Sequence, residues 1–303
     1  MPSRADIHVH TKYSGVGKLG PLRFPESIAD PRDVVNNARS LGIDVLCITD
    51  HDSIEGALKA SDYAAGLDDI EVVIGEEVST ADGELIGLFL TEKVEPGLSA
   101  EETIARIREQ NGLVIAPHPF SLHVPAVGER IFDLDLDGIE TINAGHIDTY
   151  ANRKAIEASS SGRWATLGGS DAHSLPTMGY AFTEFNGTGA EGLREAILAK
   201  RTVAKGNPMP LEKAINWSVG VVLATDVWII RSVFGKIKEV DMHDPIVNKI
   251  SVMDASKKAA ALIGSILFLL PPVPFLCGIV SKKVLKRMER NKQNGGGQGL
   301  KDL

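Results

Sequence analysis

The sequence predicts an α/β fold built from strand–helix–strand units, with mainly parallel strands. Short apolar runs alternate with amphipathic stretches from the N-terminus to about Pro210, which is typical of such units. The 303 residues suffice for one large barrel-type domain, or for a domain with an appendage. A hydrophobic fraction of 43% and a charged fraction of 24% are ordinary for a packed core, so we expect most of the chain to be ordered.

Each expected strand is a short apolar run, and cap or turn residues separate it from the next element. The runs are Asp6–His10, Asp44–Thr49, Glu71–Ile74, Leu85–Leu90, Leu113–Ala116, Gly138–Ile142, Ala165–Gly168 and Ala181–Phe185. Helices are expected after several of them, where caps and helical spacing occur. They are a helix from Asp30-Pro31 to Gly42, one that starts with the capping box Ser99–Glu102, and helices over Tyr150–Ser160 and Glu191–Ala199.

The character of the chain changes after Pro208. Apolar residues at helical spacing run from Val219 to Ile237, and Ala259–Ser281 contains no charged residue. We therefore predict an α/β domain over residues 1–207, a helical apolar extension over 208–290, and a disordered basic, Gly-rich tail over 291–303.

Charge and cysteine content narrow the functional class. The formal net charge is −8, of which Lys282–Leu303 carries +5 and the rest of the chain −13. An acidic main domain argues against non-specific nucleic-acid binding, which depends on Lys and Arg that displace counterions. The two cysteines, Cys47 and Cys277, and an N-terminus without a signal-type apolar run predict a reducing, cytoplasmic location.

Histidines and acidic residues follow the expected strands. His8 and His10 lie two apart on the first strand, so both side chains point to one face. His51 follows the second strand beside Asp50, although a turn in which Asp50 caps a helix is the alternative. For the acidic pair after the third strand, Glu77 has two oxygens that can bridge two metals, whereas we expect Glu76 to be solvated.

Two later strand ends complete this pattern. His118 stands between prolines after an apolar run, and Asp171 and His173 lie two apart in a Gly-rich strand end. Imidazole and carboxylate are ligands for Zn²⁺, Mn²⁺ or Fe²⁺, and the ends of parallel strands meet at one mouth of a barrel. Five such strand ends together predict a metal site.

The chain resembles the PHP (polymerase and histidinol phosphatase) superfamily over about residues 5–205. The stretches that carry the resemblance are IHVHTKYSG, ITDHDS, IGEEVST, APHPF and GGSDAH, in family order. The resemblance implies a distorted seven-stranded β/α barrel with two or three divalent metal ions at its strand ends. It assigns His8, His10, Glu77 and Asp171 to one metal, Glu77 and His118 to a second, and His51 and His173 to a third.

Two positions depart from the family pattern. Gly15 stands where the family often has Asp or His, which removes a ligand of the third metal. Glu84 stands where the family often has His, so the second metal would gain a carboxylate ligand instead. Mixed imidazole and carboxylate ligation leaves zinc, manganese and iron all open.

The expected reaction is hydrolysis of a small phosphorylated substrate by a hydroxide that bridges the metals. Asp50 or His173 would move protons to the leaving group, unless Asp50 only orients His51. Arg23 and Arg153 are candidates for a phosphate clamp, with exposed surface charges as the alternative. His146 would line the pocket, or cap the helix near Tyr150.

The uncharged segment Ala259–Ser281 is about 35 Å long if fully helical, enough for a bilayer core of about 30 Å. Three prolines interrupt it and lysines flank it, which favours a re-entrant hairpin or an in-plane anchor on the cytoplasmic face. The alternative is a helical pair packed on the barrel or in a dimer interface.

Phosphoesterase activity on a small molecule is the leading prediction. The alternatives are a nuclease-type phosphodiesterase, which the acidic barrel disfavours, and a catalytically silent PHP domain that acts as a tethered scaffold. Gly15 favours the scaffold, while the other ligand candidates favour the enzyme. No oligomeric state is predicted.

Overall fold

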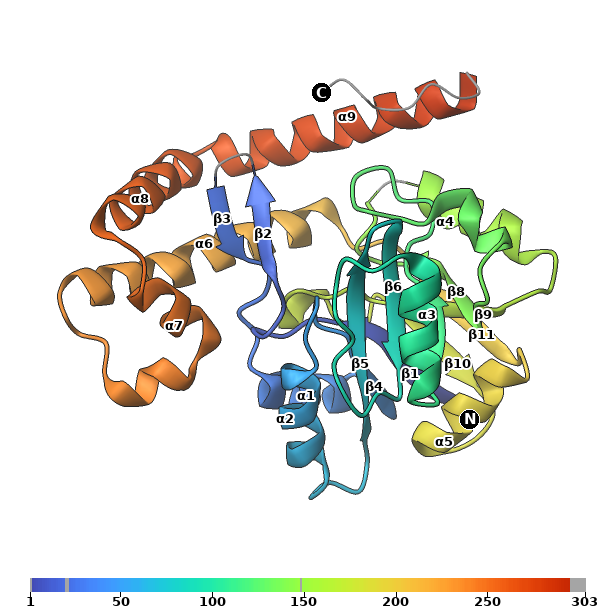
Figure 1. Cartoon of the computed structure of the whole chain (residues 1–303). Coiled ribbons are helices and arrows are strands. Elements are labelled where there is room, and N and C mark those ends of the chain that lie inside the picture. The colour runs from blue at the N-terminus through green and yellow to red at the C-terminus, as the bar shows by residue number, and fades with distance from the viewer. Residues whose placement is uncertain (1, 20–21, 148, 295–303) are drawn as a thin grey trace.

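The computed structural model describes residues 2–19, 22–147 and 149–294 (Figure 1). Its core is a sheet with the strand order β11-β10-β1-β4-β5-β6-β7-β8-β9. These strands are β1 (Ser3–Val9), β4 (Val45–Ile48), β5 (Glu71–Thr80), β6 (Gly83–Leu88), β7 (Leu113–Ala116), β8 (Gly138–Asn143), β9 (Ala165–Gly169), β10 (Ala181–Phe185) and β11 (Thr202–Gly206). A separate hairpin consists of β2 (Val16–Leu19) and β3 (Leu22–Pro25).

Threonine side chains join the two ends of the sheet, which is therefore a nearly closed barrel. The hydroxyl of Thr166 on β9 donates to the carbonyl of Thr202 on β11 at 3.0 Å. The hydroxyl of Thr202 donates back to the carbonyl of Thr166 at 2.9 Å. Closure places the strand ends around one mouth, where loops can carry a site.

The α/β barrel prediction is confirmed, and each of the expected runs overlaps a strand. The implied number of seven strands is wrong, because nine strands form the sheet within the described residues. The prediction of mainly parallel strands is also wrong. The pairs β1–β10, β10–β11, β5–β6 and β6–β7 are antiparallel. Between β5 and β6 the chain reverses without a helix, because β5 continues to Thr80 and a tight turn at Gly83 (φ 132°) follows.

Helices cover the outside of the barrel (Figure 1). They are α1 (Pro31–Ser40), α2 (Glu55–Ala64), α3 (Ala100–Glu109), α4 (Tyr150–Ser159) and α5 (Gly189–Leu198). The predicted caps are confirmed: the Asp30 side chain accepts from the Arg32 amide, and Ser99 and Glu102 form the capping box. Apolar side chains on α1 and α2, such as Val35 and Ala57, pack on the buried strand β4.

The extension consists of helices that run away from the barrel and return (Figure 1). They are α6 (Leu211–Val233), the 3₁₀ turn Glu239–His243, α7 (Pro245–Ser251), α8 (Ala255–Leu269) and α9 (Val273–Asn294). Ion pairs tie it to the barrel: Lys12 contacts Asp244 at 2.9 Å, and Arg153 on α4 contacts Glu289 on α9 at 3.2 Å. Of the predicted tail, residues 291–294 belong to α9, and residues 295–303 lie outside the described residues.

By length and composition, α6 is able to cross a bilayer. The helices α8 and α9 pass the same test as a pair that is bent by 80°. The bend falls at Pro271 and Pro272, where missing amide donors end the helical ladder.

Glu76 differs from the prediction that it is solvated, because it is fully buried on β5. One carboxylate oxygen accepts from the amide of Val94 at 2.7 Å and so holds the segment after β6. Within the described residues, the other oxygen has no hydrogen-bond partner. Burial raises the pKa of Glu76 to about 7, because desolvation disfavours the charged form.

We predict that Glu76 makes the fold less stable as the pH rises. The pKa is higher in the folded chain than in the unfolded chain, so the stabilisation is complete below about pH 4 and is lost as the pH rises through about 7. The Glu76→Gln variant should remove this dependence, which amounts to about 3 kcal/mol in the free energy of unfolding. Urea unfolding of both proteins at pH 5 and pH 8 measures it. An equal pH dependence in the two proteins would contradict the prediction.

Candidate metal centre

The first ligand candidates are fixed where β1 ends beside the loop after β9. The amide of Asp171 donates to the carbonyl of His8 at 2.8 Å, and the amide of His10 donates to the carbonyl of Ala172 at 2.9 Å. These backbone bonds bring the carboxylate of Asp171 to the two imidazoles. Its Oδ1 lies 3.5 Å from His8 Nε2 and 3.3 Å from His10 Nε2.

Glu77 is the centre of the cluster and is buried. Its Oε2 lies 3.1 Å from His8 Nε2, 3.4 Å from His10 Nε2 and 3.4 Å from His51 Nδ1. Its Oε1 lies 3.0 Å from His118 Nε2. The two oxygens therefore face different histidines, as expected of a carboxylate that bridges two ions.

These spacings fit bound metal. Ligand atoms about 2.1 Å from one tetrahedral ion lie roughly 3.4 Å from each other, close to the separations around Glu77. Within the described residues, His10 Nε2 is buried without a hydrogen-bond partner, although two carboxylate oxygens are near it. Five groups of three side chains offer ligand atoms within 4.8 Å of one another: His8-Glu77-His118, His8-His10-Asp171, His51-Glu77-Glu84, His10-His51-His173 and His118-His146-Asp171.

The charges of the cluster also favour a cation. Burial would raise the pKa of Glu77, but the imidazoles of His8, His51 and His118 outweigh burial and hold that pKa well below its usual range. Glu84 lies close to His51 and His118, at 3.9 and 3.8 Å. Burial and the negative charge of Glu77 raise the pKa of Glu84. A divalent ion between the two carboxylates would relieve their repulsion.

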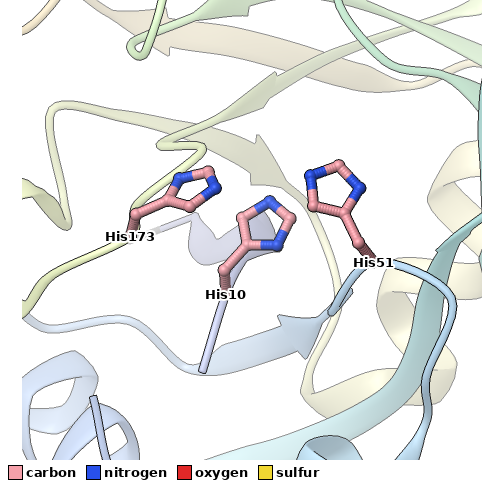
Figure 2. Close-up of side chains that lie close together, drawn as sticks. All are labelled: His10, His51 and His173. Carbon is pink, nitrogen blue, oxygen red and sulfur yellow. The ribbon is translucent and has the colours of Figure 1, made fainter. Parts of the chain in front are cut away.

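Three histidines from separate strand ends form a second part of the cluster (Figure 2). The ring of His10 stacks between two others, with centroids 4.1 Å from His173 and 4.8 Å from His51. His173 Nδ1 lies 3.1 Å from the carbonyl of Asp171, an oxygen that can only accept a hydrogen bond. This contact leaves His173 Nε2 as the nitrogen that could bind an ion.

Strained backbone accompanies the ligand candidates. His118 and Asp171 have positive φ angles of 27° and 49°, a region that residues with a side chain rarely adopt. Hydrogen bonds hold these conformations: the amide of His118 donates to Glu140, and the amide of Asp171 donates to the carbonyl of His8. Such strain concentrates at functional sites.

Glu140 was missed by the sequence reasoning, although it is a charged residue inside an apolar strand, β8. It is fully buried and accepts from the amide of His118 at 2.9 Å. The same oxygen accepts from the side-chain amide of Asn143 at 2.7 Å, and the other oxygen lies 3.3 Å from His8 Nδ1. Glu140 therefore orients two ligand candidates at once, the role of an outer carboxylate at a metal site.

Glu26 was also missed. Its Oε2 is buried, lies 3.5 Å from His51 Nε2, and has no hydrogen-bond partner within the described chain. A side chain begun at Gly15 would place its Cβ 3.6 Å from the same oxygen. The carboxylate of Glu26 thus stands where the absent side chain at position 15 would point. Trp217 of α6 holds it there, with an indole N–H that donates to the Glu26 carbonyl at 2.9 Å.

Some predicted residues lie elsewhere. The Asp50 carboxylate accepts from the Thr11 amide at 2.5 Å and from the Thr11 hydroxyl at 2.6 Å, so it braces the loop after β1. Arg153 is exposed and pairs with Glu289, away from the cluster. The side chain of Arg23 lies outside the described part of the chain. His146 is buried, and its ring lies 5.2 Å from that of His118. It therefore lies beside the ligand candidates.

A cavity of about 500 Å³ opens onto the cluster. Glu77, His118 and Asp171 line it on the metal side, and Phe24 and Trp217 line it on the side of the extension. Within the described residues its lining includes no lysine or arginine, and Arg153 is not among the lining residues.

The barrel and the cluster at its mouth define an α/β protein with metal-site candidates on its strand ends. The family model "PHP domain" matches residues 6–122, and the model "PHP-associated" matches residues 149–202. The chain belongs to the PHP family, as the sequence resemblance indicated.

Relatives match half of this chain or more. The chain is 51% identical over 153 residues to Uncharacterized protein MJ1587 of Methanocaldococcus jannaschii, covering 50% of this chain and 89% of the relative. It is 36% identical over 190 residues to Uncharacterized protein MJ0417 of the same organism, covering 60% and 70%. A solved two-domain protein of Bacteroides vulgatus, described as containing a predicted PHP-like metal-dependent phosphoesterase, has the same fold. Its TM-score is 0.56 at 18% identity, over 68% of this chain and 65% of that chain.

We predict that Glu26 contributes to metal retention. The Glu26→Gln variant should keep its fold and weaken the binding of one ion per chain by about tenfold or more, because an anionic oxygen beside His51 is lost. Metal content after dialysis against graded free Zn²⁺ or Mn²⁺ measures this. The exposed residue Glu55 on α2 supplies the control variant Glu55→Gln.

A second variant makes the test specific. The change Gly15→Asp, introduced into the Glu26→Gln background, should restore binding, since a side chain begun there points at the same space. Equal metal retention in wild type and Glu26→Gln would show that Glu26 is not a ligand.

Proposed function

We propose that this protein is a metal-dependent phosphoesterase that hydrolyses a small phosphorylated molecule. The observation that carries the proposal is Glu77, a buried carboxylate whose two oxygens face His8 and His118 at 3.1 and 3.0 Å. That arrangement suits two adjacent divalent ions, with a third near His10, His51 and His173. Membership of the PHP family and the cavity of about 500 Å³ support it.

The main role proposed for the site residues is to bind metal ions. His8, His10, His51, Glu77, Glu84, His118, Asp171 and His173 would hold two or three ions of Zn²⁺, Mn²⁺ or Fe²⁺. Such ions, when bound, lower the pKa of water toward about 7 and draw charge from phosphoryl oxygens. In the reaction, the oxygen of water forms a bond to phosphorus while the ester P–O bond breaks, and the leaving oxygen takes up a proton.

Neighbouring residues hold the ligand candidates in position before a substrate binds. Glu140 fixes the imidazole of His8 and the backbone of His118, so the ligands need little reorganisation. Asn143 donates to Asp171 Oδ2 at 3.1 Å, which leaves Oδ1 directed at His8 and His10. Phe24 and Trp217 line the cavity on its far side.

Nucleic acid fits the cavity less well than a small ester does. A strand-binding groove needs positive side chains along its length. The lining of the cavity is acidic and aromatic within the described residues, with Glu26 and Glu84 at its walls. The silent-scaffold alternative is disfavoured by Glu26, whose carboxylate fills the place left by Gly15.

The extension is proposed to attach the enzyme to the cytoplasmic face of a membrane. Large apolar side chains are exposed on all three long helices, among them Val227, Ile266 and Phe275. Lysines at 257–258 and 282–283 flank the uncharged segment and would meet anionic headgroups. Sedimentation with vesicles that contain anionic lipid should carry the full chain down, and protein that stays in the supernatant would contradict attachment.

We predict that purified protein releases phosphate from at least one ester in a panel of sugar phosphates, nucleotides and alkyl phosphates when Mn²⁺, Zn²⁺ or Fe²⁺ is supplied. The variants His8→Ala and Asp171→Asn should each lower kcat/KM by about a hundredfold or more, because each removes a ligand. The variant Arg106→Ala, on the exposed side of α3, is the control with unchanged activity. Metal-loaded protein that hydrolyses no ester in the panel would favour the scaffold.

A further inference from the structure

A second cavity, of about 230 Å³, lies between the hairpin and the extension. Its walls come from β3, α6 and α8, with apolar side chains that include Val221, Ile229, Ala261 and Phe268. The cavity presents far more apolar than polar surface. It is therefore suited to a hydrocarbon group and not to a second phosphate.

Two hydroxyl groups at this cavity already have partners within α6. The hydroxyl of Ser218 donates to the carbonyl of Ile215 at 2.8 Å, and the hydroxyl of Thr225 donates to the carbonyl of Val221 at 2.7 Å. Asp226 also lines the cavity, and one of its carboxylate oxygens is buried without a hydrogen-bond partner within the described residues. Burial raises the pKa of Asp226, because desolvation disfavours the charged form.

This apolar cavity adjoins the cavity at the metal-ligand cluster. Phe24 and Trp217 line both of them. The ring of Trp217 lies 5.2 Å from the ring of His173, and its N–H holds the backbone of Glu26. A molecule with its phosphoryl group at the cluster could thus extend past Trp217 into the apolar cavity.

We propose that the apolar cavity binds the hydrocarbon chain of an amphiphilic phosphoester whose phosphoryl group lies at the metal-ligand cluster. This inference rests on the proposed phosphoesterase function and names its substrate class. The occupant follows from continuity: one cavity has the ligands for ions that bind phosphate, and the adjoining one has an apolar lining. The helices that form it, α6 and α8, carry exposed Val227 and Ile266, which suit a lipid surface as the source of such molecules.

The volume sets a chain length. If a methylene takes about as much room as a water molecule, roughly 30 Å³, the cavity holds a chain of about seven or eight carbons. Each methylene removed from water contributes about 0.8 kcal/mol, equivalent to about a fourfold gain in affinity. The gain should stop when the cavity is full.

The test uses the full-length protein and n-alkyl phosphates from ethyl to dodecyl, below their micellar concentrations. The proposal predicts that kcat/KM rises about fourfold per methylene up to about eight carbons and then levels off. The variant Gly264→Leu on α8 puts a side chain into the cavity and should abolish the rise, while turnover of ethyl phosphate is unchanged. Gly220→Leu on α6, where an added Cβ meets nothing within 4 Å, is the matched control and should keep the rise.

Binding separates this proposal from the proposed function. Calorimetric titration with the matching alkylphosphonates, which resist hydrolysis, should give the same gradient in affinity and the same loss in Gly264→Leu. A gradient in binding without any hydrolysis would overturn the phosphoesterase function and keep the chain site. Affinities that are flat with chain length, or a gradient that Gly264→Leu leaves intact, would overturn the chain site.

Discussion

The buried carboxylate of Glu77 among the imidazoles is the interaction on which the site depends. Isolated buried charges cost several kcal/mol, so a cluster of acids and histidines at the mouth of a barrel survives only with mutual compensation. His8, His51 and His118 supply part of it by holding Glu77 ionised. Divalent ions among the same atoms would supply the rest, and their binding would then stabilise the fold.

Closure of the barrel brings the residues of this cluster together. Threonines at positions 166 and 202 join the sheet ends, and backbone bonds fasten Asp171 beside His8 and His10. Glu140, buried in β8, then fixes ligand candidates from two different strands. The register of β1 therefore decides the ligand geometry, because a slip of one residue in β1 would turn both histidines away from the cluster.

Most of the barrel strands and the ligand candidates could be predicted because their patterns are local. The spacing of His8 and His10 fixes a shared face, and Asp171 and His173 follow a Gly-rich strand end. Glu26 and Glu140 could not be found that way, because their roles come from neighbours distant in sequence. Glu140 offered one signal, a charge inside an apolar strand. The reversal of β5 into β6 was missed because a strand and its hairpin partner have the same alternating pattern.

The extension contributes residues to the site. Trp217 comes from α6, yet it holds Glu26 and lines both cavities, so residues after 208 complete a site that the barrel begins. That the extension is a domain of its own stays a prediction. Contacts of this kind connect the extension to the barrel. The carboxylate of Glu26, directly after the hairpin, lies where a side chain at position 15 would point.

Anomalous X-ray diffraction at the Mn and Zn absorption edges, from crystals of the full chain grown with either metal, tests the central claim most directly. The account predicts at least two anomalous peaks, one on each side of the Glu77 carboxylate, within about 2–2.2 Å of its oxygens. Ordered protein at millimolar metal with no anomalous peak beside Glu77 would contradict it.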